Sequence, residues 1–96
     1  MNNFGIILLD WWWINLNNIH DDNYYFSIIR KNIKKYRIEK KLTQQQLADK
    51  AGVSMNYISK IESVKMNKGF TIIVLGRIAD ALEIDIRKLF DDVEIN

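Results

Sequence analysis

Cysteine and proline are absent from this 96-residue sequence, and His20 is its only histidine. Without cysteine there is neither a disulfide framework nor a thiolate metal site, and one histidine cannot build a structural zinc cluster. The four glycines form no phosphate-binding loop, and His20 has no recognisable nucleophile beside it. We therefore expect a cytoplasmic protein that is not an enzyme and that needs neither a metal nor a cofactor.

Lysine and arginine are missing from residues 1–26, which contain seven of the eleven aromatic residues. The apolar stretch from Phe4 to Leu16 is interrupted by Asp10 and is too short to span a bilayer. No basic residue precedes it and no small-residue cleavage site follows it, so a secretory signal is not expected. Three interpretations stay open for residues 1–26: packing on the domain or on a second subunit, a poorly ordered or non-native leader, or a position at a membrane interface.

Positive charge is concentrated in residues 27–69, where eleven lysines and arginines outnumber three acidic residues. The segments on either side, 1–26 and 70–96, each carry a net charge of −3, and the whole chain carries +2. A basic segment of this kind favours polyanionic partners. The length allows one domain, which we place at residues 27–90, between an aromatic N-terminal extension (1–26) and an acidic tail (91–96).

The stretch from Gln44 to Ser63 predicts two short helices joined by a glycine turn. Thr43 and Gln46 have the spacing of a capping box, and Gly52 is expected to end the first helix in the left-handed conformation. Ser54 is the expected N-cap of the second helix. This arrangement is typical of a helix-turn-helix motif, whose second helix enters the major groove of DNA.

Apolar residues recur at helical spacing on both sides of the motif. They predict helices over residues 27–40 and 72–82, and a short helix over 86–90 that Asp85 caps. The start of the first of these helices stays open, because it has four possible N-caps: Asp21, Asp22, Asn23 and Ser27. Gly76 interrupts the second of these and is expected to mark a close helix contact. The expected core residues of these helices and of the motif's second helix are Ile29, Ile33, either Tyr36 or Arg37, Ile58, Ile61, Leu75, Ile78, Ala79, Leu82, Ile86, Leu89 and Phe90.

Residues 29–90 resemble the Cro/cI-type (Xre-like) helix-turn-helix domain of phage repressors and bacterial regulators. The stretches that carry the resemblance are IKKYRIEKKLTQQQLADKAGVSMNYISKIES and LGRIADALEIDIRKLF. The resemblance implies an all-α, five-helix Cro/cI-like (lambda-repressor-like) DNA-binding domain. It also implies a sequence-specific transcriptional regulator of double-stranded DNA, a dimeric repressor that reads the major groove with residues 54–63.

The same resemblance implies roles for individual residues. Base edges would be contacted from the start of the recognition helix by Ser54, Met55, Asn56, Ser59 and Lys60. Phosphates would be contacted by Lys40, Lys41, Thr43, Gln44, Tyr57, Lys65 and Lys68. Arg37 and Glu62 match a buried ion pair that joins the first and third helices of the family.

Two narrower alternatives stay open. The chain could be an antitoxin-type interaction module with autoregulatory DNA binding, gripping its partner through residues 4–16, or it could be a restriction–modification controller. Ile73 and Val74 are apolar where the family is usually polar. We expect this patch to meet the aromatic N-terminal segment or a second subunit.

Overall fold

Five helical elements follow one another in the computed structural model, which describes residues 22–63 and 69–91. Within these residues there is no strand, so the all-α prediction is confirmed. The fifth element is a 3₁₀ helix. The elements are α2 (Asp22–Glu39), α3 (Gln44–Ala51), α4 (Met55–Glu62), α5 (Ile72–Leu82) and η1 (Ile86–Phe90).

Each element after α2 begins at a residue whose side chain caps it. The Thr43 hydroxyl accepts a hydrogen bond from the Gln46 amide at 3.0 Å, and the Gln46 side chain accepts one from the Thr43 amide. Ser54 accepts from Tyr57 N at 3.0 Å in the same way. These bonds satisfy amides that have no acceptor inside the helix, and so they fix where α3 and α4 start. Thr71 and Asp85 cap α5 and η1.

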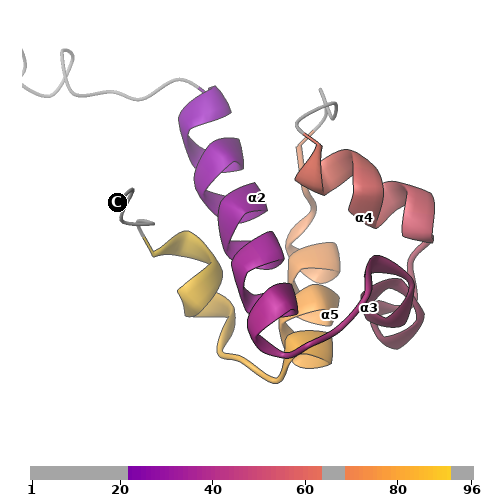
Figure 1. The fold of residues 1–96 in the computed structure, drawn as a ribbon. Helices are drawn as coiled ribbons and strands as arrows, with labels where there is room; N and C mark the ends of the chain where they lie inside the picture. Colours follow the sequence, from indigo (N-terminus) through magenta and orange to yellow (C-terminus); the bar gives the residue numbers. More distant parts are fainter. Residues whose placement is uncertain (1–21, 64–68, 92–96) are drawn as a thin grey trace, which may run out of the picture.

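The helices enclose one apolar core. α2 packs against α4 and α5 on one side and against η1 on the other, while α3 packs against α4 and α5 (Figure 1). Isoleucine and leucine side chains at helical spacing meet in the middle, which is the packing that their periodicity predicts. The buried apolar residues are Ile29, Ile33, Leu47, Ala48, Ala51, Ile58, Ile61, Leu75, Ile78, Ala79, Leu82 and Leu89.

The first helix begins at Asp22, which is within the range of starts that its possible caps left open, and it is longer at this end than residues 27–40. Its additional turn is held by Phe26, whose ring meets Phe70 edge-on with 5.8 Å between the ring centroids. Edge-to-face pairs of this kind stabilise the packing of two segments. The segment assigned to the N-terminal extension therefore contributes its last residues to α2 and to the contact with the chain that leads into α5.

Two expectations about the C-terminal half are wrong. Phe90 is 47% exposed instead of buried, because a 3₁₀ helix has three residues per turn and aligns Ile86 with Leu89, leaving Phe90 on another side. Gly76 marks no close helix contact, since a Cβ atom built there meets nothing within 4 Å.

A buried asparagine on α2 holds the C-terminal element. Asn32 is 1% exposed, and its Nδ2 donates to the carbonyl oxygens of Leu89 at 2.9 Å and Asp91 at 2.7 Å. A buried amide without partners is costly, so these bonds stabilise the docking of η1 on α2. Sequence reasoning did not find this contact.

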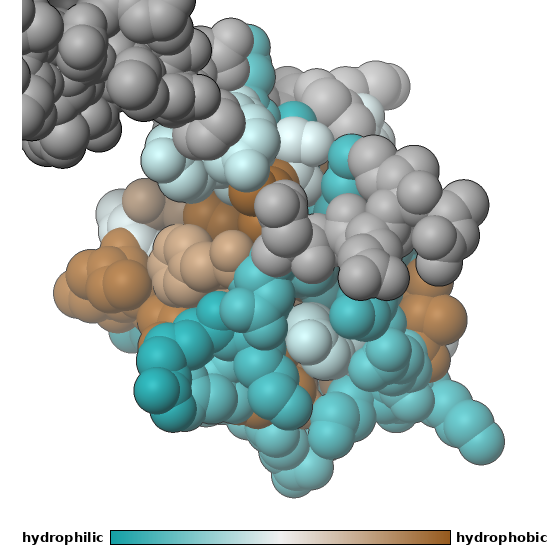
Figure 2. Space-filling model, turned by 90° about the vertical axis from the view of Figure 1, so that its left-hand side faces the viewer, coloured by the Kyte–Doolittle hydropathy of each residue, from teal (hydrophilic) through white to brown (hydrophobic). Residues whose placement is uncertain are grey.

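Apolar side chains also reach the surface. Figure 2 shows such residues at the edges of one face, around a hydrophilic lower region. The large exposed hydrophobic residues are Tyr25, Ile38, Met55, Ile72, Ile73 and Phe90. Across residues 22–63 and 69–91, no helix combines the length and the apolar character that crossing a bilayer requires.

Candidate nucleic-acid interface

A left-handed glycine sets the angle between α3 and α4. Gly52 has φ 71° and ψ 33°, and its amide bonds back to the carbonyl of Ala48. A residue with a Cβ is strained in this conformation, whereas glycine is not. The turn lets Ile58 and Ile61 become fully buried, so that the opposite face of α4 is left to the solvent.

The residues expected to read bases lie together on that outer face. Ser54, Met55, Asn56 and Lys60 are exposed, and Ser59 is half-buried. They fall within two turns of one helix, where positions three and four residues apart are neighbours. Their chemistry is mixed: an amide, a hydroxyl, an ammonium group and a thioether that is 44% exposed. This is a compact polar surface whose members suit the donors, acceptors and methyl groups of base edges.

The N-terminus of α3 lies beside this surface. The amides of Gln46 and Leu47 bond to the Thr43 hydroxyl and carbonyl, respectively. The two amides before them, on Gln44 and Gln45, have no acceptor inside a helix. A helix N-terminus with free amides attracts anions, because its dipole is positive there.

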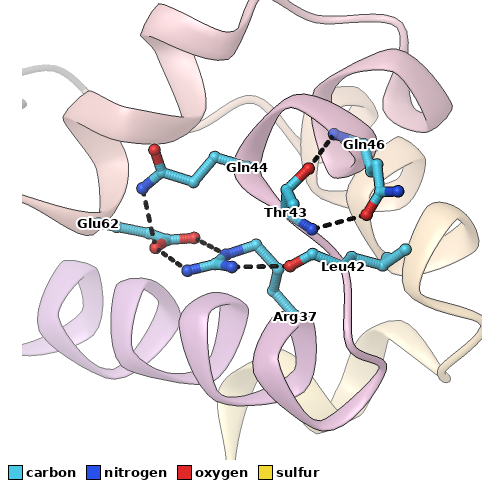
Figure 3. Close-up of polar contacts among 6 residues, drawn as sticks. All are labelled: Arg37, Leu42, Thr43, Gln44, Gln46 and Glu62. Atoms are coloured by element: carbon cyan, nitrogen blue, oxygen red, sulfur yellow. Dashed lines mark hydrogen bonds and ion pairs between the residues drawn. The ribbon is translucent and has the colours of Figure 1, made fainter.

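A bidentate ion pair ties these elements to α2 (Figure 3). Arg37 Nε donates to Glu62 Oε2 at 2.7 Å, and Arg37 Nη2 donates to Glu62 Oε1 at 2.8 Å. Arg37 Nη1 donates to the carbonyl of Leu42 at 2.7 Å. The side chains of Arg37 and Glu62 are 14% and 4% exposed, and the hydrogen bonds to Glu62 raise the pKa of Arg37. The pair that the family resemblance implied thus joins α2, the turn before α3, and α4.

Gln44 extends this network to the start of α3. Its Nε2 donates to Glu62 Oε1 at 3.2 Å, which points the side chain at α4 (Figure 3). A primary amide carries two donor hydrogens. One hydrogen is directed at Glu62. Gln44 could therefore donate to a phosphate only through the second hydrogen of its side chain or through its backbone amide.

The remaining expected phosphate contacts lie in three environments. Lys40, Lys41 and Thr43 are exposed in the turn between α2 and α3, and Lys41 has a left-handed φ of 59°. Tyr57 is half-buried, and its burial raises the pKa of its hydroxyl. Lys65 and Lys68 fall outside the described residues.

The sequence analysis did not include Lys34 or Ser63 among its candidate site residues. Both line a shallow hollow of about 220 Å³ together with Arg37, Gln44, Ser59 and Glu62. Lys34 stands one helical turn before Arg37 on α2, and this spacing is the signal that could have placed it beside the ion pair. Among the described residues, no three histidine, cysteine, aspartate or glutamate side chains gather as a metal site would require.

Known proteins are similar to this chain over the stretch that contains α3 and α4. A helix-turn-helix family model matches residues 33–89. The HTH-type transcriptional regulator SinR of Bacillus subtilis is 34% identical over 65 residues, which are 68% of this chain and 58% of SinR. The chain therefore spans less than two thirds of that relative's length.

Solved structures share the fold. The restriction–modification controller protein C.AhdI from Aeromonas hydrophila superposes with a TM-score of 0.66 at 25% identity, covering 74% of this chain and 100% of that one. A variant of the controller protein C.Esp1396I gives 0.63 at 34% identity, covering 70% and 84%. The N-terminal DNA-binding domain of SinR gives 0.61 at 34% identity, covering 68% and 93%.

Proposed function

The chain belongs to the Cro/cI-type helix-turn-helix family of DNA-binding transcriptional regulators, and on that premise we propose that it is a sequence-specific, dimeric repressor of transcription. One observation carries the proposal: the outer face of α4 is exposed, polar and contiguous, and it adjoins the free amides of α3. A helix presented in this way fits the major groove.

In this proposal one group of residues contacts base edges and another contacts phosphates. Asn56 pairs with adenine, Lys60 donates to guanine, and Met55 contacts a thymine methyl, while Ser54 and Ser59 add hydroxyl contacts. The phosphate contacts orient the domain without reading sequence. They are Lys40, Lys41, Thr43, Gln44, Tyr57, Lys65 and Lys68, joined by Lys34 from the hollow beside Gln44.

A second copy of the chain enlarges the site that is read. One short helix contacts only a few base pairs, and a two-fold dimer reads two half-sites about 34 Å apart. We assign the dimer contact to Ile72 and Ile73 at the start of α5, each 66% exposed. Val74, which the sequence grouped with Ile73, is half-buried and packs on the core, because each helical residue turns the side chain by about 100°.

Selection of bound sequences from a random duplex library tests the proposal. A two-fold symmetric consensus with half-sites about one helical turn apart is the expected result. Affinity for the selected duplex should exceed that for a scrambled duplex, and both affinities should fall as salt rises. Enrichment of no sequence, or equal binding to both duplexes, contradicts sequence-specific reading. Repression is then measured with a reporter whose promoter carries the consensus.

Molar mass in solution tests the dimer separately. The wild-type chain should elute from size exclusion with the scattering mass of two copies, and Ile73→Lys should reduce it to one. Ile38→Lys is a matched control, because Ile38 is an exposed isoleucine (56%) on α2. Identical masses for wild type and Ile73→Lys would remove this face from the proposal.

A restriction–modification controller is the second candidate. It is favoured by two solved structures that share this fold and are restriction–modification controller proteins, C.AhdI at 25% identity and C.Esp1396I at 34% identity. The selected consensus distinguishes the two candidates. Its occurrence upstream of a restriction endonuclease gene in the source genome supports a controller, and its absence there removes this candidate.

A further inference from the structure

A buried arginine on α2 forms no ion pair with any residue that the structure describes. Arg30 is 8% exposed, and its Nε has no hydrogen-bond partner within the described part of the chain. Its side chain lines a hollow of about 230 Å³ between α2 and the end of α4. The other lining residues are Ser27, Lys31, Lys34 and Glu62.

The charge of this hollow is positive. Among the described residues of its lining Glu62 is the only acid, and both carboxylate oxygens of Glu62 already accept from the Arg37 guanidinium. Arg30, Lys31 and Lys34 therefore face the hollow without a carboxylate of their own. Burying the Nε–H donor of Arg30 without an acceptor costs free energy, and an anion bound in the hollow would remove that cost.

We propose that the hollow is a binding site for a phosphate-type oxyanion. The planar fork of Arg30 matches two oxygens of such an anion, and Lys31 and Lys34 supply further charge at the rim. The Ser27 hydroxyl lies within the same lining and provides a neutral donor. The volume exceeds the roughly 30 Å³ that a water molecule occupies in the liquid, so an anion of this class has room to enter.

This hollow continues into the one beside Gln44. Lys34 and Glu62 line both. From Ser27 to Lys34, α2 rises about 10 Å, which is longer than the separation of two neighbouring phosphates on one DNA strand. Two sources of the same chemistry therefore fit: free phosphate, or a backbone phosphate flanking the half-site. Only binding of a DNA backbone phosphate rests on the proposed function; binding of free phosphate does not.

Thermal unfolding with inorganic phosphate tests the site without DNA. At constant ionic strength, replacing chloride by phosphate should raise the wild-type Tm in a saturable way. Arg30→Met should abolish this shift without lowering the Tm in chloride, because it removes an unpaired charge and keeps the bulk. Arg77→Met is the matched control, since Arg77 is an exposed arginine on α5, and it should retain the shift. If phosphate still raises the Tm of Arg30→Met, the proposal that free phosphate binds at Arg30 is wrong.

Duplexes with and without flanking base pairs test the second source. For the wild type, affinity should fall more steeply with salt on the duplex with flanking base pairs, by the amount that about one additional phosphate contact gives. For Arg30→Met, the salt dependence should be the same on both duplexes. Flank dependence without a phosphate shift identifies DNA as the source, and the reverse identifies a free anion. If neither effect depends on Arg30, the site does not exist. Failure to bind any duplex contradicts the proposed function but leaves the phosphate measurement valid.

Lys31→Gln provides a second variant should Arg30→Met fail to fold. Lys31 is exposed, so its substitution leaves the core unchanged. It should reduce the affinity for whichever anion source the wild type responds to. An unchanged phosphate midpoint and an unchanged flank effect in Lys31→Gln count against the proposal.

Discussion

Glu62 on α4 receives two hydrogen bonds from the guanidinium of Arg37 on α2, at 2.7 and 2.8 Å, with only 4% of its side chain exposed. The same carboxylate accepts from Gln44 at the start of α3. One acidic group thus fixes α2, α3 and α4 relative to one another.

Removing one partner of this pair should cost more than removing both. Glu62→Leu leaves the Arg37 charge largely buried, and we expect it to lower the free energy of unfolding by about 3 kcal/mol. The double variant Arg37→Met/Glu62→Leu should lose less than Glu62→Leu alone. Urea unfolding of wild type, both single variants and the double variant measures the coupling. Additive losses would show that the residues do not act as a pair.

Asn32→Ala should weaken the docking of η1. The carbonyls of Leu89 and Asp91 lose their donor, and the loss in unfolding free energy should be about 2 kcal/mol. Hydrogen exchange should also accelerate at the amides of η1. Asn56→Ala removes an exposed asparagine and serves as the stability control. Equal stabilities of the two variants would contradict the structural role given to Asn32.

Two glycines should respond to alanine in opposite directions. Gly76→Ala should stabilise the chain by about 1 kcal/mol, because alanine favours the helix and its Cβ meets no neighbouring atom. Gly52→Ala should destabilise it by about 1 kcal/mol, since its φ of 71° strains any residue with a Cβ. Chemical unfolding compares both with wild type. A destabilised Gly76→Ala would reveal a neighbour that the structure does not place there.

Asn56→Ala and Lys41→Ala should separate sequence reading from phosphate binding. Loss of the Asn56 amide should relax specificity at one position of the consensus by about 1–3 kcal/mol. Loss of the Lys41 charge should weaken binding to all sequences alike and reduce the salt slope by about one. Binding titrations on selected and scrambled duplexes distinguish the effects. Equal losses on both duplexes for Asn56→Ala would exclude its reading role.

Acid stability should depend on Asp85. Hydrogen bonds from the Arg87 side chain and amide lower the pKa of Asp85 from 3.8 to about 2. Because the folded-state pKa lies below the unfolded one, the stabilisation is present above about pH 4 and is lost as the pH falls towards 2. Asp85→Asn should flatten the decline of stability in this window. A carboxyl titration midpoint for Asp85 near 3.8 by NMR would contradict the interaction.

The sequence predicted the helices whose ends are set locally. Thr43, Gln46, Gly52 and Ser54 lie within a few residues of the amides and carbonyls that they cap, so their spacing contains the necessary information. The exposed face of α4 follows in the same way from the burial of Ile58 and Ile61. Family resemblance added the Arg37–Glu62 pair, which spacing alone does not reveal.

Contacts between distant segments could not be predicted. Asn32 bonds to a carbonyl 57 residues away, and no local pattern distinguishes it from an exposed asparagine. In the sequence Arg30 is one of several cations on a basic helix, and no local pattern reveals that only 8% of it is exposed in the fold. Phe90 was misplaced because the sequence does not distinguish a final α-helical turn from a 3₁₀ turn.

The bonds of Asn32 also bear on the order in which the domain forms during synthesis. Its second acceptor, Asp91, follows 59 residues later, so α2 leaves the ribosome long before this amide has both partners. Until then the emerging chain can bury Asn32 only at a cost, which disfavours early closure of the core. Folding is therefore expected to be completed only after residue 91 has cleared the exit tunnel.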